Sequence, residues 1–185
     1  DNTVVQGRPV MALALDHLIH SYVIPDDPTY LGYEYEQIFS EITSYVEAER
    51  GRPLDLLMIG GGGYTFPRAL EVLRPDHGLT VVEIDPKVTE TAFSSLALNP
   101  ATKIVSYNED GRDFFLRNGD HKADIVVGDA FNDLSVPYHL TTLEFSQLIK
   151  SHLRDGGFYM ANIIDDFKEG EFLQAFVNTQ AQAFK

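Results

Sequence analysis

The sequence contains no cysteine, and it contains few basic residues for its length. Without cysteine, disulfides, thiolate metal sites and cysteine nucleophiles are all excluded. The chain has 14 lysines and arginines against 28 aspartates and glutamates, which gives a formal net charge of −14. Nucleic acid requires a cationic surface and is therefore excluded as an expected partner. An acidic surface instead concentrates cations, although the same charge also serves solubility alone.

Long hydrophobic runs are absent as well. No apolar run approaches the about 18 residues that a membrane helix needs, and no signal peptide is visible. We therefore expect no membrane contact within these 185 residues. The chain begins at Asp1 and not at methionine, which is typical of a processed or excised piece with further segments outside it. Hydrophobic residues make up 44% and aromatic residues 11%, a composition typical of a globular domain.

An alternation of strand and helix patterns fills most of the chain. The predicted strands are 54–59, 80–84, 103–107, 124–127 and 158–163, and the predicted helices between and after them are 67–73, 86–98, 112–118, 141–153 and 170–184. This alternation predicts a doubly wound α/β fold, in which a parallel sheet of the Rossmann-like methyltransferase type has helices on both faces. An open sheet of this type normally adds a strand after such a final helix. We therefore expect C-terminal strands to be missing from the chain.

A shorter, β-rich segment precedes this alternation. Residues 4–24 are rich in branched residues typical of strands, with Asp16 and His17 as the predicted turn. An amphipathic helix follows over 33–49, where apolar residues recur at steps of three and four. We therefore divide the chain into an N-terminal β segment with the first helix, 1–50, and a nucleoside-binding Rossmann-like domain, 51–185.

The nucleoside assignment comes from glycines and acids at the ends of the predicted strands. Gly60–Gly63 follow the first strand, Glu83 ends the second, and Asp110 and Asp129 follow the third and fourth. Ligands of open α/β sheets bind at the carboxyl ends of the strands, where glycine allows close backbone approach. An acid about 20 residues after the glycines can accept both hydroxyls of a ribose. The pattern therefore predicts ribose on Glu83 and adenine near Asp110.

Several of these positions have a second interpretation that the sequence leaves open. Asp85, which precedes Pro86, suits the cap of the following helix as well as a ligand contact, and Asp110 equally suits a helix cap. A dinucleotide fits poorly because Thr65 stands where the third glycine of G-x-G-x-x-G is required, and no positive residue lies among the glycines. A nucleoside without phosphate, carrying a sulfonium, fits both the loop and the acidic charge better.

Motifs along nearly the whole chain resemble one family. They are "LDLLMIGGGG", "VVEIDP", "NEDGRDFF", "DIVVGDAFND" and "HLTTLEFSQLIKSHLRDGGFYMAN", preceded by "LDHLIH" and "YEQIF". In this order they resemble the spermidine/spermine synthase family, the aminopropyltransferases, which share the fold of S-adenosylmethionine-dependent methyltransferases. The segments "GGGGYTFPR" and "DAFNDLSVPYHLTT" are most similar to those of bacterial versions fused behind a bundle of membrane helices.

The resemblance implies an adenosyl sulfonium donor, either S-adenosylmethionine or its decarboxylated form, and no metal. It assigns nucleoside binding to Gly60, Gly61, Gly62, Glu83, Asp110 and Gly111, proton abstraction from the attacking amine to Asp129, and acceptor binding to Tyr35, Asp133 and His20. The implied partners are a small-molecule nucleoside and a polyamine. A homodimer is common in the family, and a cytoplasmic location, as the soluble domain of a membrane-fused protein, is expected.

Three positions depart from the family pattern. Gly63 replaces the aspartate that holds the aminopropyl ammonium, Asn132 replaces the second acid of D-S-S-D, and His20 replaces a glutamine. Aminopropyl transfer is the first hypothesis. The alternatives are methyl transfer and a non-catalytic module that binds a polyamine or nucleoside.

Three further candidates have a functional and a structural interpretation each. His139 either lines the acceptor pocket or is a loop histidine, and Tyr64 either closes over the nucleoside or packs on a helix. Asp165 and Asp166, at the end of the fifth strand, either contribute to a cationic acceptor site or form a solvated turn.

Overall fold

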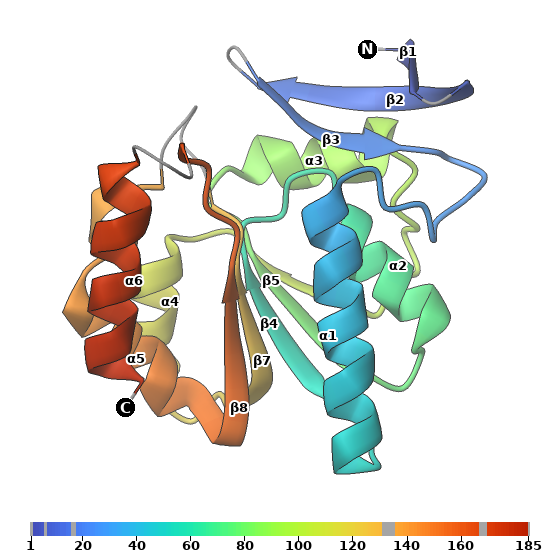
Figure 1. Cartoon of the computed structure of the whole chain (residues 1–185). Coiled ribbons are helices and arrows are strands. Elements are labelled where there is room, and N and C mark those ends of the chain that lie inside the picture. The colour runs from blue at the N-terminus through green and yellow to red at the C-terminus, as the bar shows by residue number, and fades with distance from the viewer. Residues whose placement is uncertain (1, 6, 16–17, 131–135, 167–169, 185) are drawn as a thin grey trace.

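The computed structural model describes residues 2–5, 7–15, 18–130, 136–166 and 170–184. At its centre is a five-stranded parallel sheet (Figure 1) with the order β6-β5-β4-β7-β8. Its strands are β4 (Asp55–Ile59), β5 (Gly78–Val82), β6 (Val105–Tyr107), β7 (Ala123–Gly128) and β8 (Leu153–Ala161). The chain runs from β4 outward to β6, returns to β7 and continues outward to β8. The predicted doubly wound sheet is therefore confirmed, and the strand order reverses between β4 and β7.

Helices cover both faces of this sheet (Figure 1). They are α1 (Glu34–Arg50), α2 (Thr65–Leu73), α3 (Pro86–Ser95), α4 (Gly111–Arg117), the 3₁₀ turn η1 (Tyr138–Leu140), α5 (Leu143–His152) and α6 (Glu171–Ala183). Successive residues of β4 point to opposite faces. Leu56 and Met58 lie in one apolar core with side chains of α1, α2 and α3, whereas Leu57 and Ile59 lie in a second core with side chains of α4 and α5. Both cores hold the sheet in place beneath the strand ends.

The N-terminal β segment forms a separate antiparallel sheet of β1 (Asn2–Val5), β2 (Arg8–Leu15) and β3 (Leu18–Val23). It lies beside α3 (Figure 1), where Leu13 and Val23 pack against Val88 and Leu96. The small N-terminal β segment is therefore confirmed, while its predicted turn at 16–17 lies outside the described residues. The division at residue 50 stays a prediction, and α1 shares its core with the larger sheet.

One predicted boundary is wrong. We expected the fifth strand to begin at residue 158 after a helix ending at 153, but β8 begins at Leu153, directly after α5. Leu153 is already extended, with φ −75° and ψ 139°, and pairs with Ala123 of β7. Gly156 and Gly157 lie inside the strand, at a register shift.

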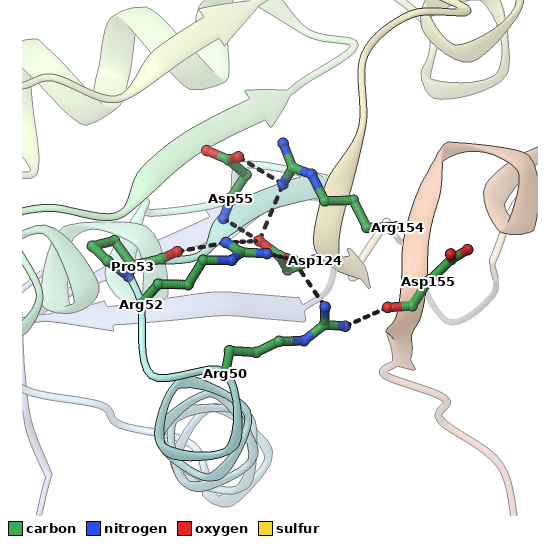
Figure 2. Close-up of polar contacts among 7 residues, drawn as sticks. All are labelled: Arg50, Arg52, Pro53, Asp55, Asp124, Arg154 and Asp155. Carbon is green, nitrogen blue, oxygen red and sulfur yellow. Dashed lines mark hydrogen bonds and ion pairs between the residues drawn. The ribbon is translucent and has the colours of Figure 1, made fainter.

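An ion cluster lies at the amino ends of the strands, opposite the glycine loop (Figure 2). Asp124 of β7 is fully buried and accepts hydrogen bonds from Arg52 Nη2 at 2.6 Å, Arg52 Nη1 at 3.0 Å and Arg154 Nη1 at 3.1 Å. The backbone N–H of Asp55 donates to the same carboxylate at 3.0 Å, and Arg50 approaches to 3.9 Å. This carboxylate therefore joins the end of α1 with β4, β7 and β8.

Candidate active site

A cavity of about 720 Å³ opens at the carboxyl ends of the parallel strands. Its lining includes eight of the ten predicted site residues: His20, Tyr35, Gly60, Gly62, Glu83, Asp110, Gly111 and Asp129. Gly61 lies behind this lining, where its N–H contacts Glu83. Asp133, like Asn132, lies outside the described residues. The cavity therefore gathers residues from β3, from α1 and from the carboxyl ends of all five parallel strands.

The glycine loop closes tightly over the sheet. Gly60 and Gly62 have φ values of +97° and +47°, a region that favours glycine, and a Cβ at Gly60 would collide with the carbonyl oxygen of Asp129. Glu83 is only 7% exposed and holds the loop from below. Its Oε2 accepts from the N–H of Gly61 at 2.7 Å, and its Oε1 accepts from the N–H of Asp85 at 2.9 Å. Each carboxylate oxygen can accept a further hydrogen bond on the cavity side.

Two open interpretations are decided in favour of the structural one. The Asp85 carboxylate caps α3, accepting from the N–H of Lys87 at 2.9 Å. Tyr64 is fully buried and does not close over the cavity, because its hydroxyl hydrogen-bonds with Thr89 and Ser106.

Asp165 belongs to an exposed turn. It is exposed and outside the residues that line the cavity, and its Oδ2 accepts from the N–H of Leu173 at 2.7 Å. Asp166, its neighbour, is also exposed and outside the cavity lining. The geometry therefore favours the solvated turn over an acceptor site at these two acids.

Asp110 combines both of its predicted interpretations. Its Oδ1 caps α4 by accepting from the N–H groups of Arg112 and Asp113 at 2.8 and 3.1 Å, while the residue also lines the cavity. Its Oδ2 lies 2.8 Å from Nε2 of His139. His139 therefore lines the cavity, with Asp110 as its hydrogen-bond partner.

Asp129 is a half-buried acid of the cavity wall, and both of its carboxylate oxygens have a hydrogen-bond partner. The Tyr35 hydroxyl donates to its Oδ2 at 3.0 Å, and Nδ2 of Asn162 donates to its Oδ1 at 3.0 Å. Burial raises the pKa of Asp129, and these two hydrogen bonds offset that rise only in part. Burial and the charge of Asp129 likewise raise the pKa of the Tyr35 hydroxyl, so it remains a donor. A half-buried carboxylate with a raised pKa, hydrogen-bonded at both oxygens, suits a general base.

Sequence reasoning missed two residues of this arrangement, Asn162 and Glu36. Asn162 is the last residue of the fifth-strand motif. Its place at the end of that strand is the feature of the sequence that could have identified it. Glu36 lies on the buried side of α1, 3% exposed, where it accepts from the N–H of Tyr33 at 3.2 Å and from the hydroxyl of Thr65. Burial raises its pKa to about 7, with a contribution from the charge of Asp129. The feature of the sequence that could have revealed Glu36 is an acid three residues after Tyr33, the N-cap residue of α1.

Glu36→Gln is expected to stabilise the protein in a pH-dependent way. Because the pKa of Glu36 is about 7 when folded and 4.5 as its ordinary value, the folded protein binds the extra proton between these values. Stability is therefore lost as pH rises through this window, and glutamine removes the loss. Its amide can still accept from Tyr33 and donate to Thr65. Urea denaturation should show a gain of about 1–3 kcal/mol at pH 8 and almost none at pH 4.5.

Glu34→Gln is the matched control, since Glu34 lies in the same first turn of α1 but is exposed. It should change stability by less than about 0.5 kcal/mol at either pH. A gain for Glu36→Gln that is equal at both pH values would contradict the assigned pKa shift.

Gly63 is packed directly against the N-terminal sheet. A Cβ at this position would collide with the side chain of Ser21 on β3, so an acid cannot be accommodated here without rearrangement. The Ser21 hydroxyl is buried and has no hydrogen-bond partner among the described residues. Glycine at position 63, where the family loop has an aspartate, therefore fits the close packing of Ser21 against this position. Among the described residues, no group of three or more histidine, aspartate or glutamate side chains is placed to hold a metal ion. The absence of a metal stays a prediction.

Comparison with known proteins places these features in a family context. A family model described as "Spermine/spermidine synthase domain" matches residues 37–185. The chain is 34% identical over 119 residues to a polyamine aminopropyltransferase of Vibrio vulnificus (strain CMCP6), covering 63% of this chain and 40% of that protein. It is 31% identical over 130 residues to a probable polyamine aminopropyl transferase of Bifidobacterium longum (strain NCC 2705), covering 69% and 28% respectively. The chain thus spans less than half the length of both relatives.

Solved structures show the same fold at low sequence identity. A probable spermidine synthase from Corynebacterium glutamicum ATCC 13032 aligns with a TM-score of 0.71 at 20% identity, over 88% of this chain and 63% of that one. A spermidine synthase in complex with the transition state analogue AdoDATO gives 0.70 at 19% identity, over 95% and 58%. Human methyltransferase-like protein 13 in complex with SAH gives 0.65 at 22% identity, over 79% and 70%.

In the part of the chain that the structure describes, the helices are too short or too polar to cross a membrane.

Proposed function

The chain belongs to the spermine/spermidine synthase domain family, and on this premise we propose that it transfers an aminopropyl group from an adenosyl sulfonium donor to an amine acceptor. The observation that carries the proposal is Asp129, a half-buried carboxylate fixed by Tyr35 and Asn162 in the wall of the cavity. The names of the two curated relatives support the same reaction class.

The donor nucleoside is proposed to lie over the glycine loop. Glu83 accepts the ribose hydroxyls, and Asp110 accepts from the amino group of the adenine. Gly60, Gly62 and Gly111 allow the nucleoside to approach the backbone. Glu83 and Asp110 each keep acceptor capacity beyond their internal hydrogen bonds, which supports these roles. Decarboxylated S-adenosylmethionine is the proposed donor and a polyamine the proposed acceptor.

The transfer itself needs alignment and one proton transfer. The acceptor nitrogen attacks the carbon next to the sulfonium, a C–N bond forms, and the C–S bond breaks to release methylthioadenosine. Because the sulfonium is already a good leaving group, alignment supplies much of the rate enhancement. Asp129 takes the proton that the nitrogen must lose, and its raised pKa brings it closer to that task. Tyr35 and Asn162 orient its two oxygens.

Methyl transfer is the second candidate, and Gly63 favours it. With no side chain possible at this position, no acid of the glycine loop can meet the ammonium of an aminopropyl arm. The pocket could then admit the intact methionine tail of S-adenosylmethionine. A purely binding function is disfavoured by the hydrogen bonds that fix Asp129.

A two-donor assay tests the proposal. The protein is supplied with S-adenosylmethionine or its decarboxylated form, together with putrescine, spermidine or cadaverine, and both nucleoside products are measured by mass spectrometry. Methylthioadenosine is expected only with the decarboxylated donor and an amine. S-adenosylhomocysteine as the sole product would support methyl transfer, and no product with either donor, while nucleosides still bind, would support a binding module.

A further inference from the structure

His139 lies in the cavity wall and takes no part in the proposed transfer step. Its Nε2 is 2.8 Å from Oδ2 of Asp110, and both residues line the cavity. The two side chains are 33% and 25% exposed, so each combines a buried part with a surface open to a ligand. His139 therefore contacts the acid that is proposed to face the purine.

The hydrogen bonds of Asp110 leave one oxygen for a ligand. Its Oδ1 is occupied by the N–H groups of Arg112 and Asp113 at the start of α4. Its Oδ2 has His139 as its partner, and a carboxylate oxygen can accept two hydrogen bonds. An ionised carboxylate is only an acceptor, so Nε2 of His139 carries the proton in this pair. One acceptor position on Oδ2 is left, and its direction depends on the imidazole.

The backbone of His139 is held by the segment that carries Asp110. Arg112 donates from Nη1 to the carbonyl oxygen of His139 at 2.9 Å and to the hydroxyl of Thr142 at 3.3 Å. The chain therefore forms a closed arrangement, in which Asp110 contacts His139, His139 contacts Arg112, and Arg112 follows Asp110 by two residues. Such an arrangement keeps the carboxylate in one orientation before a ligand arrives.

We propose that His139 is a positioning residue that gives the site its preference for a purine with an amino group at position 6 over one with an oxo group. The inference rests on the proposed function, in which Asp110 faces the purine. An amino group donates to the carboxylate, whereas an oxo group would place one acceptor against another. Burial alone would raise the pKa of Asp110, but hydrogen bonds from His139 and from the backbone of Asp113 and Arg112 lower it. The carboxyl therefore stays ionised and cannot donate to an oxo group.

Two amide variants test this role. His139→Gln can place its amide N–H near the position of Nε2, whereas His139→Asn is shorter and falls short of Asp110. Calorimetry is performed on the protein with methylthioadenosine and with its 6-oxo analogue, methylthioinosine. The unchanged protein should prefer the amino form about 100-fold. The preference should fall about tenfold in His139→Asn and stay within about threefold in His139→Gln.

Tyr138→Leu is the matched control, because Tyr138 neighbours His139 in η1 but is 83% exposed and outside the cavity lining. It should leave the preference unchanged. An equal loss of affinity for both nucleosides in His139→Asn, with the preference kept, would indicate a merely structural role and overturn the inference alone. If neither nucleoside binds the unchanged protein, the proposed function fails, and the inference with it.

Discussion

Replacing Asp129 by asparagine is expected to lower turnover by about 10²–10⁴-fold and to leave the affinity for methylthioadenosine within about threefold. Asparagine preserves the shape of the side chain, and its amide can still hydrogen-bond with Tyr35 and Asn162, but it cannot accept a proton. Nucleoside affinity should survive because Glu83 and Asp110 stand at the ends of other strands, β5 and β6. Release of methylthioadenosine measures the first quantity, and calorimetry measures the second.

Asp85→Asn serves as the control for the Asp129 variant. Asp85 also follows a parallel strand, but its carboxylate caps α3, and asparagine is an equally good cap. Turnover should therefore change by less than about threefold. Equal losses of turnover and nucleoside affinity in Asp129→Asn would refute the role of base.

The pH dependence gives a second readout for the same residue. A general base must be deprotonated, so kcat/KM should rise with pH through the pKa of Asp129. Because burial raises that pKa, the rise should lie above pH 3.8, the ordinary value for aspartate. In Asp129→Asn this rise should disappear, and a rise that persists would belong to another group.

The sequence was sufficient to predict the strand-end residues because parallel strands end at one edge of their sheet. Once the alternation of strands and helices is recognised, Gly60, Glu83, Asp110 and Asp129 must lie near one another. No side-chain detail is needed for that conclusion. The position along the strand alone places them in the cavity wall, where the structure has them.

The contacts among the side chains could not be predicted in the same way. Asn162 reaches Asp129 from a strand 33 residues later, and Glu36 reaches Thr65 across 29 residues. Each contact depends on which face of a strand or helix turns inward, and on the packing of α1 against α2. A glutamate in the first turn of a helix is normally solvated, so its burial follows only from tertiary packing.

Tyr64 is a position where the sequence left two interpretations open, contact with the nucleoside or packing on a helix, and the structure shows the packing. The backbone at Tyr64 is left-handed, with φ +57°, and this turns the side chain away from the cavity and into the core. A conformation of this kind is uncommon for a residue other than glycine, so the sequence offered no signal for it.

Asp124→Asn is expected to lower the free energy of unfolding by about 3 kcal/mol at pH 7. The carboxylate is fully buried and takes hydrogen bonds from Arg52, from Arg154 and from the backbone of Asp55 (Figure 2). Removing its charge leaves Arg52 without its carboxylate partner, takes from Arg154 one of the two carboxylates that it contacts, and deletes one acceptor oxygen. Urea denaturation followed by circular dichroism measures the loss. The affinity of the folded protein for methylthioadenosine should not change, because the cluster lies at the opposite ends of the strands.

The sign of the pH effect distinguishes this charge from a packing defect. Burial alone would raise the pKa of Asp124, but the hydrogen bonds from Arg52 and the N–H of Asp55 lower it below its ordinary value of 3.8. Its stabilisation is therefore present above the unfolded pKa and is lost as pH falls through the lower, folded one. The difference between parent and Asp124→Asn should shrink below about pH 4. Asp155→Asn, at an exposed site where Arg50 contacts only the backbone carbonyl, should cost less than about 0.5 kcal/mol. An Asp124→Asn loss that is equal at pH 7 and pH 3 would show that shape, and not charge, holds β4, β7 and β8 together.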